Sequence, residues 1–341
     1  MDQLSAHLDR GWDLAQKGDA AGASACAKRA LELDPQSPEV HNLLGYTAAM
    51  TGDADEALEH YRQAITLDET YFEAMLNAAE VLMHPLAEWD EAVDLCDDAF
   101  DYAETKEEIA DCVLLRLDAL LGKGDTEEAK KCMARLPEPP FENPSYVFLI
   151  GRAFYELGEA QKALPYIEEA VRTDPAHADA HYYLGLLRDD GGDMRGAIEA
   201  FLRARALDVT RPEAAWAPSP DTFAELVRRV MQGLDALLVR WVRDADVYIV
   251  DVPGAELVVD GVDPRAMVIV DARLPDEPTS GPQGIDTLRA RVFIYQRNIE
   301  RAAGSAAAME SELAEALERE ITAVFLDRER SEAPADKHHL N

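Results

Sequence analysis

The chain has 341 residues, of which 48% are hydrophobic and 29% charged, and its formal net charge is −34. This length can hold two domains with a core each, and the composition is that of a folded protein, not a disordered one. The negative field disfavours nucleic acid and anionic membranes as partners and favours a basic peptide or protein surface. The alternative is that the charge only keeps a large helical surface soluble.

The N-terminal residues show no cationic segment followed by an apolar stretch, and no run of about 18 apolar residues occurs. We therefore expect no signal peptide, no membrane insertion and a cytoplasmic location. The four cysteines, Cys26, Cys96, Cys112 and Cys132, lie in helical patterns without a CxxC spacing. They are expected to be reduced and buried, not disulfide-bonded or zinc-binding.

A spacing of 34 residues organises the chain up to about residue 211. Gly11 aligns with Gly45 at this offset, and Gly151 aligns with Gly185 at the same offset. Further pairs at the same offset are Gly18 and Gly52, Ala23 and Ala57, Ala30 and Ala64, Gly158 and Gly192, Ala163 and Ala197, and Ala170 and Ala204. This pattern resembles the signature of the tetratricopeptide repeat (TPR). The resemblance implies antiparallel helix pairs, A and B, stacked into a solenoid.

Local residues predict where each helix pair turns and ends. A Gly-Asp step such as Gly52-Asp53 is expected to form the turn between the two helices, with the aspartate capping helix B. Asp34-Pro35 and Asp174-Pro175 are expected to end helix B, because proline lacks a backbone donor and restricts the residue before it.

Six repeats are predicted, at residues 4–37, 38–71, 72–105, 110–143, 144–177 and 178–211. The third carries an insertion at His84-Pro85. The fourth has Leu136 where a small residue is expected, and prolines from Pro137 onward end it early. The middle two repeats are therefore divergent, and a local change in the curvature of the solenoid is expected there.

The register assigns eight side chains to the concave face that the A helices line. These residues combine aromatic bodies with polar groups, which suits peptide recognition. They are Trp12, Asn42, Tyr46, Phe148, Arg152, Tyr155, Tyr182 and Leu186. The alternative for each is that it only packs between neighbouring repeats. Because basic residues are scarce among them, a clamp for the C-terminal carboxylate of a peptide is not expected.

His177 and His181 are four residues apart on a predicted helix, which is a metal-ligand spacing. The repeat explains them differently. His7, His41 and His181 occupy the same repeat position, where a large packing residue is usual. Packing, not metal binding, is therefore the favoured interpretation.

The period stops after Leu207, and residues 212–220 are predicted to be a linker. Residues 221–243 show apolar residues at helical spacing, and residues 306–328 form a last predicted helix. Four short β-branched or aromatic runs between them predict strands. These runs are Val247–Val250, Leu257–Val259, Met267–Val270 and Val292–Tyr295. Residues 221–330 are therefore expected to form a small α+β domain, followed by a disordered tail at 331–341.

The order of these elements, the stretches around Val250-Asp251-Val252-Pro253 and Gly261–Pro264, and the run Arg291–Arg301 resemble the small bacterial zincin-like metallopeptidases, the minimal gluzincins. The resemblance implies a His-Glu-x-x-His motif on the last helix, with two zinc-binding histidines and a glutamate that activates water. Here the motif falls on Arg319-Glu320-Ile321-Thr322-Ala323, so the glutamate is present and both histidines are replaced. The resemblance thus implies a degenerate domain, without metal or cofactor.

Glu320 is the one relic of the implied site. Helical spacing places it on the apolar side of its helix. It is expected to pair with an arginine such as Arg291 or Arg297, to line a cleft reused for binding, or, as the favoured alternative, to reach water at the rim. Glu329 is a possible third acidic ligand, whereas His338 and His339 fall in the predicted tail.

The leading hypothesis from these patterns is a mostly α-helical, non-enzymatic scaffold that binds a partner protein or peptide through the concave face of the repeats. Two alternatives remain open. One is a zinc-dependent peptidase that its repeats recruit to substrates, and the other is a pseudoenzyme domain that binds a small ligand.

Overall fold

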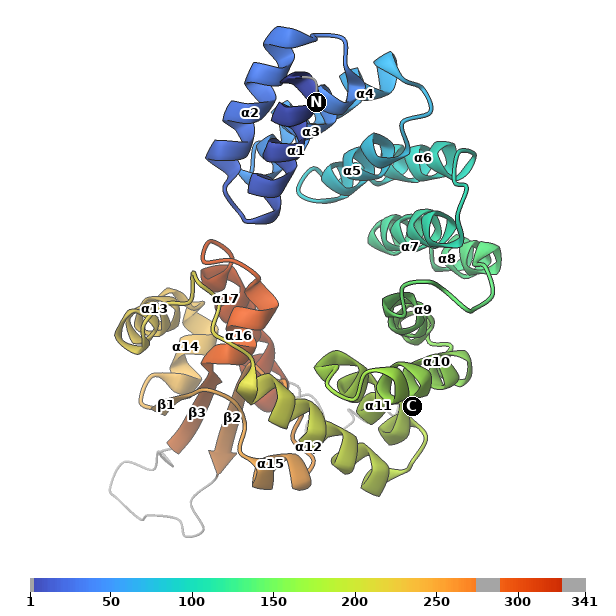
Figure 1. Ribbon diagram of the computed structural model, residues 1–341. Helices are drawn as coiled ribbons and strands as arrows, with labels where there is room; N and C mark the ends of the chain where they lie inside the picture. The colour runs from blue at the N-terminus through green and yellow to red at the C-terminus, as the bar shows by residue number, and fades with distance from the viewer. Residues whose placement is uncertain (1–2, 274–288, 327–341) are drawn as a thin grey trace, which may run out of the picture. The chain divides into compact units, whose positions relative to one another are not determined.

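A computed structural model describes residues 3–273 and 289–326 of the chain, which are mostly helical (Figure 1). The chain divides into two compact units, Met1–Pro175 and Ala176–Asn341. Each is described by itself below. The expectations for Glu329, His338, His339 and the 331–341 tail lie outside the described residues.

The first unit is a row of helix pairs. Its helices are α1 (Gln3–Gln16), α2 (Ala20–Leu33), α3 (Pro38–Met50), α4 (Ala54–Leu67), α5 (Phe72–Met83), α6 (Trp89–Phe100), α7 (Lys106–Lys123), α8 (Thr126–Cys132), α9 (Ser145–Glu156) and α10 (Ala160–Thr173). Within this unit α5, α7 and α9 lie on the inner side of a curved stack, and α6, α8 and α10 lie outside them (Figure 1). The A helices thus form one wall, as predicted.

The turns between paired helices follow the predicted chemistry. Gly18 and Gly52 have φ angles of +79° and +82°, which glycine adopts without the penalty that a Cβ atom brings. Asp19 then accepts a hydrogen bond from the backbone N of Gly22 at 2.8 Å, and Asp53 accepts one from Glu56 at 3.1 Å. The predicted aspartate caps are therefore confirmed at both turns.

Small residues at the helix crossings let the two helices of a pair approach closely. A Cβ atom added to Gly45 would lie 2.6 Å from Cε1 of Tyr61, whose ring fills the space above the glycine. Tyr61 is fully buried, and the same crossing holds Ala57 and Ala64 at zero exposure. Close packing of this kind leaves no room for a larger side chain at residue 45.

The two divergent repeats keep their helix pairs but alter the details. His84 ends α5, and a cis peptide bond joins it to Pro85 before α6 begins at Trp89. Helix α8 is seven residues long and passes into a 3₁₀ turn at Met133–Arg135 before the proline-rich stretch. All four cysteines lie on helices of this unit and are buried and unpaired, as expected for packing residues.

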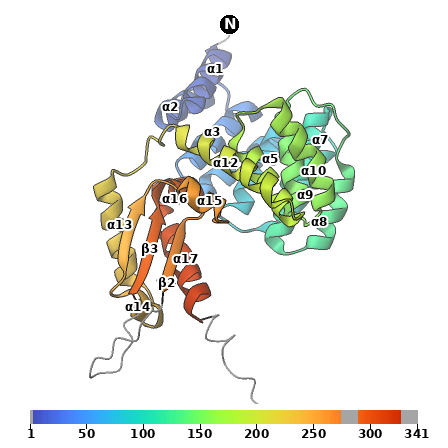
Figure 2. The same ribbon diagram turned by 90° about the horizontal axis from the view of Figure 1, so that it is seen from below.

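The second unit begins with the helix pair α11 (Ala178–Asp190) and α12 (Met194–Thr210). It continues with α13 (Pro220–Gly233), α14 (Ala236–Val242), β1 (Asp246–Val250), α15 (Ala255–Val259), β2 (Val268–Arg273), β3 (Arg289–Tyr295), α16 (Gln296–Ala303), α17 (Met309–Ile321) and a π-helical turn at Thr322–Leu326. The strand order is β1-β3-β2, with β1 parallel and β2 antiparallel to β3 (Figure 2).

One apolar core joins this sheet to the helices around it. It includes Phe223 and Val227 of α13, Val292 and Ile294 of β3, and Leu313 of α17, all at most 2% exposed. Val292 and Ile294 are two residues apart on β3, so every second residue of this strand lies in the core. This is the expected pattern for a strand with one buried face. The predicted small α+β arrangement is present after residue 220.

Two local predictions in this unit are wrong. Leu257–Val259 is helical, within α15, because a three-residue β-branched run has no length over which strand alternation can be distinguished from a buried helical turn. The predicted single helix at 221–243 is broken after Gly233, where Asp235 caps a new helix by accepting a hydrogen bond from the backbone N of Leu237 at 2.8 Å. The last helix, expected from residue 306, begins at Met309 and passes into the π-helical turn.

Candidate functional site

One repeat position on the A helices of the first unit carries a series of chemically varied side chains. Alignment of the small crossing residues places Trp12, Tyr46, Glu80, Asp118 and Arg152 at this position. Sequence reasoning named Trp12, Tyr46 and Arg152 but missed Glu80 and Asp118, which lie in the divergent repeats. The signal was available, because Ala79 follows Gly45 by 34 residues, and Asp118 precedes Ala129 by the same interval at which Tyr46 precedes Ala57.

The predicted groove residues of the first unit differ in how far they reach the surface. The rings of Trp12 and Tyr46 are 5.2 Å apart and half-buried. Asn42 is only 2% exposed, and Phe148 only 7%. Burial of this degree favours the packing alternative for Asn42 and Phe148, whereas Trp12 and Tyr46 keep surface that a partner can contact.

Asn42 links two successive A helices. Its amide donates to the hydroxyl oxygen of Tyr71 at 3.2 Å, and its carbonyl oxygen accepts from Asn77 of α5 at 3.0 Å. A buried amide needs such partners, because an unpaired polar group in the interior costs about 1–3 kcal/mol. Asn42 therefore fixes the register of one repeat on the next.

A charged group lies further along the A helices, where α7 and α9 pack together. Asp118 is solvent-exposed, yet burial by the surrounding protein raises the pKa of its carboxyl group, and Arg152 only partly opposes this. Desolvation of this kind disfavours the charged form of the carboxyl group although its side chain reaches solvent. Nε of Arg152 is 3.4 Å from the Glu156 carboxylate, and within the described part of the chain it donates no hydrogen bond to a protein acceptor.

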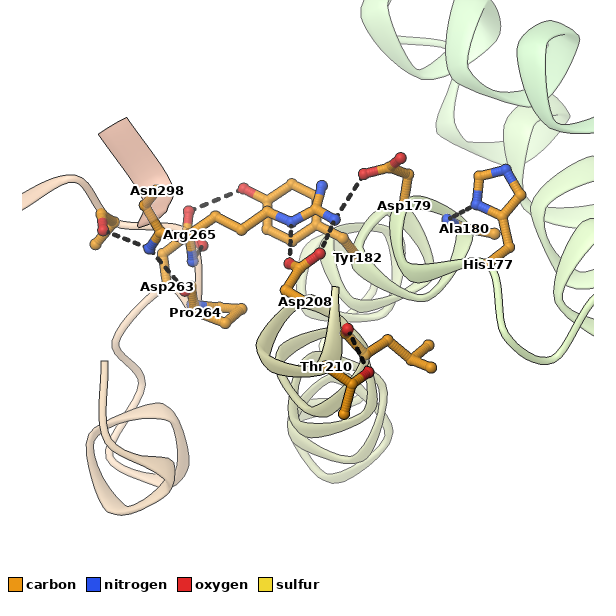
Figure 3. Close-up of polar contacts among 12 residues, drawn as sticks. His177, Asp179, Ala180, Tyr182, Asp208, Thr210, Asp263, Pro264, Arg265 and Asn298 are labelled. Carbon is orange, nitrogen blue, oxygen red and sulfur yellow. Dashed lines mark hydrogen bonds and ion pairs between the residues drawn. The ribbon is translucent and has the colours of Figure 1, made fainter. Parts of the chain in front are cut away.

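In the second unit, Tyr182 and Leu186 lie on α11 at the positions that sequence reasoning assigned to the groove. The Tyr182 hydroxyl donates to the Asp263 carboxylate at 2.9 Å, and the Arg265 guanidinium lies 4.3 Å from the centre of the Tyr182 ring (Figure 3). The second unit therefore supplies its own contacts to Tyr182, from the segment between α15 and β2. Leu186 is half-buried beside it on the same helix.

Arg265 is the centre of this contact. Its side chain is 6% exposed and pairs with Asp208 at 3.0 Å and with Asp179 at 2.6 Å, carboxylates that are 10% and 40% exposed (Figure 3). Burial alone would raise the pKa of Asp179, but the neighbouring Arg265 outweighs burial and lowers it. A buried guanidinium requires such partners, because an unpaired charge in the interior is strongly unfavourable.

Further bonds hold α12 to the chain that follows residue 250. Arg205 of α12 donates to the backbone oxygen of Pro253 at 2.5 Å, and Arg297 donates to the backbone oxygen of Val209 at 2.8 Å. Asn298 donates to the backbone oxygens of Pro264 and Ala266 at 3.0 and 2.7 Å, which fixes the segment carrying Arg265. The last helix pair and the α+β region thus form one packed body.

His177 and His41, two of the candidate histidines, make local contacts within their repeats. Nδ1 of His177 accepts a hydrogen bond from the backbone N of Ala180 at 3.2 Å and so caps α11. Nδ1 of His41 and Nδ1 of His60 are 3.2 Å apart, and Nε2 of His41 is 3.1 Å from the backbone oxygen of Pro35. Within residues 3–273 and 289–326 no three His, Cys, Asp or Glu side chains are grouped as metal ligands would be.

Glu320 lies beside the edge strand of the sheet. Its Oε1 atom is 3.4 Å from the backbone N of Val270 in β2, a long hydrogen bond to a strand that pairs with β3 on its other side. Arg291 pairs with Asp271, and Arg297 is bonded to α12. Among the described residues, neither arginine is therefore the partner of Glu320, as one of the sequence alternatives had suggested. Arg319 and Ala323, at the implied histidine positions, are exposed.

The comparisons with known proteins concern the repeats. The tetratricopeptide repeat family model matches residues 8–72 and 148–212. The BBSome complex member BBS4 of Bos taurus is 22% identical over 204 residues, 58% of this chain and 37% of that protein. Tetratricopeptide repeat protein 7B of Homo sapiens is 27% identical over 133 residues, 39% of this chain and 15% of that protein. The chain therefore spans well under half the length of these relatives.

Two solved structures resemble the fold. PilF of Pseudomonas aeruginosa superposes with a TM-score of 0.52 at 19% identity, covering 61% of this chain and 93% of that one. PilW, a type IV pilus biogenesis factor, superposes with a TM-score of 0.51 at 17% identity, covering 65% and 98%. Of the helices described here, none is both long and apolar enough to span a bilayer. The helix pairs and the family match together show that this chain carries tetratricopeptide repeats, at residues 8–72 and 148–212.

Proposed function

We propose that this protein is a scaffold that binds a partner protein or peptide through the A-helix surface of its first unit. Trp12, Tyr46, Glu80, Asp118 and Arg152 form this surface, and from here on it is called the A face. The single observation that carries the proposal is Asp118. It is an exposed carboxylate that the surrounding protein desolvates, so a cationic group from a partner would be more favourable there than water is.

The chemistry of the A face suits an extended peptide with basic residues. Trp12 and Tyr46 offer aromatic surface with polar groups, which is the composition of strong contact residues in interfaces. Glu80 and Asp118 add negative charge at the same repeat position, within a chain of net charge −34. A positively charged partner would therefore be attracted from a distance and held by charge-assisted hydrogen bonds at short range.

The relatives support binding as the class of function. BBS4 is described as a member of a complex and PilW as a pilus biogenesis factor, and neither description is that of an enzyme. Their partners cannot be transferred to this chain, because the match covers the repeats and leaves most of BBS4 unmatched.

We also propose that residues 221–330 contribute a non-catalytic domain whose fold is of the zincin-like type that the sequence resembles. The residues at the implied ligand positions do not fit a zinc ion, because alanine has no donor atom and the arginine carries positive charge. Elemental analysis of the purified full chain tests this. If the chain held one equivalent of zinc, and Glu320→Gln lost both the zinc and a peptidase activity, the domain would be a zinc-dependent peptidase and the proposal would be wrong.

A displayed library of random peptides, panned on the immobilised full chain, tests the binding proposal. The wild type is expected to enrich peptides with lysine or arginine. Asp118→Asn is expected to weaken the selected peptides by about tenfold, the effect of losing one charge-assisted hydrogen bond in a partly desolvated site.

Glu168→Gln is the matched control, because Glu168 is an exposed carboxylate on α10, an outer helix. It removes the same charge and should leave binding unchanged. An equal loss of peptide affinity in Asp118→Asn and Glu168→Gln would mean that only the net charge of the protein matters, not the position of Asp118. Peptides without basic residues, bound equally by the wild type and Asp118→Asn, would contradict the proposal.

A further inference from the structure

The second unit contains a pocket that the binding surface of the first unit does not explain. Its volume is about 460 Å³, and it lies where the end of α12, residues 211–216 and α16 meet. Pockets of roughly 300–1,000 Å³ are the usual size for small-molecule sites. Its charged lining residues are Asp208, Arg211, Glu213, Arg297, Glu300 and Arg301.

Two of the charged groups in the lining are committed to structure. Asp208 pairs with the buried Arg265. Arg297 donates to the backbone oxygens of Val209 and Arg211, which are at the C-terminal end of α12. Such carbonyls have no partner within their own helix, so Arg297 satisfies them and carries its charge at the negative end of the helix dipole.

Arg301 differs from these two. In the described residues, its guanidinium donates no hydrogen bond to a protein acceptor, although the side chain offers five donors. Arg301 is an exposed residue, yet desolvation by the surrounding protein, and then the positive charge of Arg265, lower the pKa of its guanidinium, and Asp208 and Asp179 only partly oppose this. A guanidinium crowded in this way and facing a cavity is stabilised by an anion that enters the cavity.

Positive and negative side chains are equal in number in the lining, although the protein as a whole is strongly acidic. Three arginines, Arg211, Arg297 and Arg301, face three carboxylates, Asp208, Glu213 and Glu300. Asp208 is bonded to Arg265, which also pairs with Asp179. Glu300 is 8% exposed, and its Oε1 atom accepts a hydrogen bond from Gln296 at 2.8 Å, so it remains part of the wall. A single added negative charge would pair with Arg301, and a second one would meet the glutamates.

We propose that this pocket binds a small organic monoanion, a carboxylic acid with an apolar body of about the size of one ring. The carboxylate binds the Arg301 guanidinium, whose planar donors match the two oxygens of a carboxylate. Trp216, Val252 and Pro212 line the same pocket and provide the apolar wall against which the body lies. This activity is independent of partner binding at the A face.

Three probes with one body and different charges test the proposal on the full chain by isothermal titration calorimetry. They are phenylacetate, phenylacetamide and phenethylamine, which are anionic, neutral and cationic. Phenylacetate is expected to bind with a Kd of about 1 mM or lower, and the other two at least about tenfold more weakly. Inorganic phosphate, a small anion without a body, is expected to bind more weakly than phenylacetate.

Variants assign the binding to the pocket. Arg301→Gln is expected to weaken phenylacetate by about tenfold or more, which is the loss of one bidentate ion pair. Arg211→Gln, at an exposed position where folding is not at risk, should weaken it several-fold. Arg228→Gln, on the exposed side of α13 and outside the pocket, removes the same charge and should have no effect.

Three results would overturn the proposal. The first is that none of the anions binds at about 10 mM, a concentration at which even a weak specific site would be largely filled. The second is equal binding of phenylacetate and phenylacetamide, which would mean that the pocket recognises only the apolar body and not the carboxylate. The third is wild-type affinity in both Arg301→Gln and Arg211→Gln.

Discussion

Asn42 in the first unit and Tyr182 in the second occupy the same position of the repeat, yet they serve different neighbours. Asn42 is hydrogen-bonded to Asn77 on the next A helix, so it joins one repeat to another. Tyr182 is hydrogen-bonded to Asp263 and lies against Arg265, so it joins the last repeat to the α+β region. The position therefore works as a coupling site in both units, and in the last repeat the coupled element is no longer a repeat. Solenoids need such an end structure, because a final repeat otherwise exposes an apolar face.

The largest expected effect comes from breaking the coupling at its charged centre. Arg265→Gln should lower the free energy of unfolding of the second unit by about 3 kcal/mol, because it leaves the nearly buried Asp208 carboxylate without its cation. Urea denaturation followed by far-UV circular dichroism measures the loss. The double variant Arg265→Gln/Asp208→Asn should recover part of it, since no buried charge then remains unpaired. Full stability in Arg265→Gln alone would refute the role given to this pair.

An intermediate effect separates Tyr182 from the aromatic side chains of the A face. Tyr182→Phe keeps the ring beneath Arg265 and removes the hydroxyl that donates to Asp263, which should cost about 1 kcal/mol. Tyr46→Phe, on the A face, should change stability by no more than about 0.5 kcal/mol. Thermal unfolding of the two variants beside the wild type provides the measurement. An equal loss in both would mean that the two positions do not differ in their coupling.

The smallest expected effect is a pH dependence confined to the first unit. Burial, and then the neighbouring His41, lower the pKa of His60 from 6.5, with Lys28 acting in the same direction and Glu56 and Glu59 opposing. A lowered histidine pKa means that the folded protein resists protonation. Stability is therefore highest above pH 6.5 and falls as the pH drops from 6.5 to the folded-state pKa, below which the loss levels off.

Denaturation midpoints at several pH values between 5 and 8 would measure this dependence, with His60→Gln as the comparison. The variant lacks the titrating ring and should show a flatter profile over that range. A steeper profile in His60→Gln would contradict the assignment.

The regular repeats were predictable because a fixed offset of 34 residues brings the same residue types back to the same helix crossings and turns. Gly45 beneath Tyr61 and Asp53 at the following turn each follow from that offset and from local chemistry. The helix at Leu257–Val259 was mistaken for a strand because three residues carry too little periodicity. Glu80 was missed because its repeat departs from the signature.

The charged coupling in the second unit had no comparable signal. Arg265 meets Asp208, which is 57 residues away, and no local propensity relates the two. Only the folded arrangement of α12 against the segment after α15 brings them together. Arg301 gave no signal either. It lies in the last turn of helix α16, where a basic residue is common, and only the fold places it at the cavity.

The Arg265 pairing also restricts how this array of repeats can change length. A new helix pair inserted before residue 176 would leave Asp179, Asp208 and Arg265 in the same body, with their ion pairs intact. An insertion after residue 211 would move the two carboxylates away from their guanidinium. The final helix pair is thus tied to the region behind it, and an added helix pair is expected to be tolerated only before it.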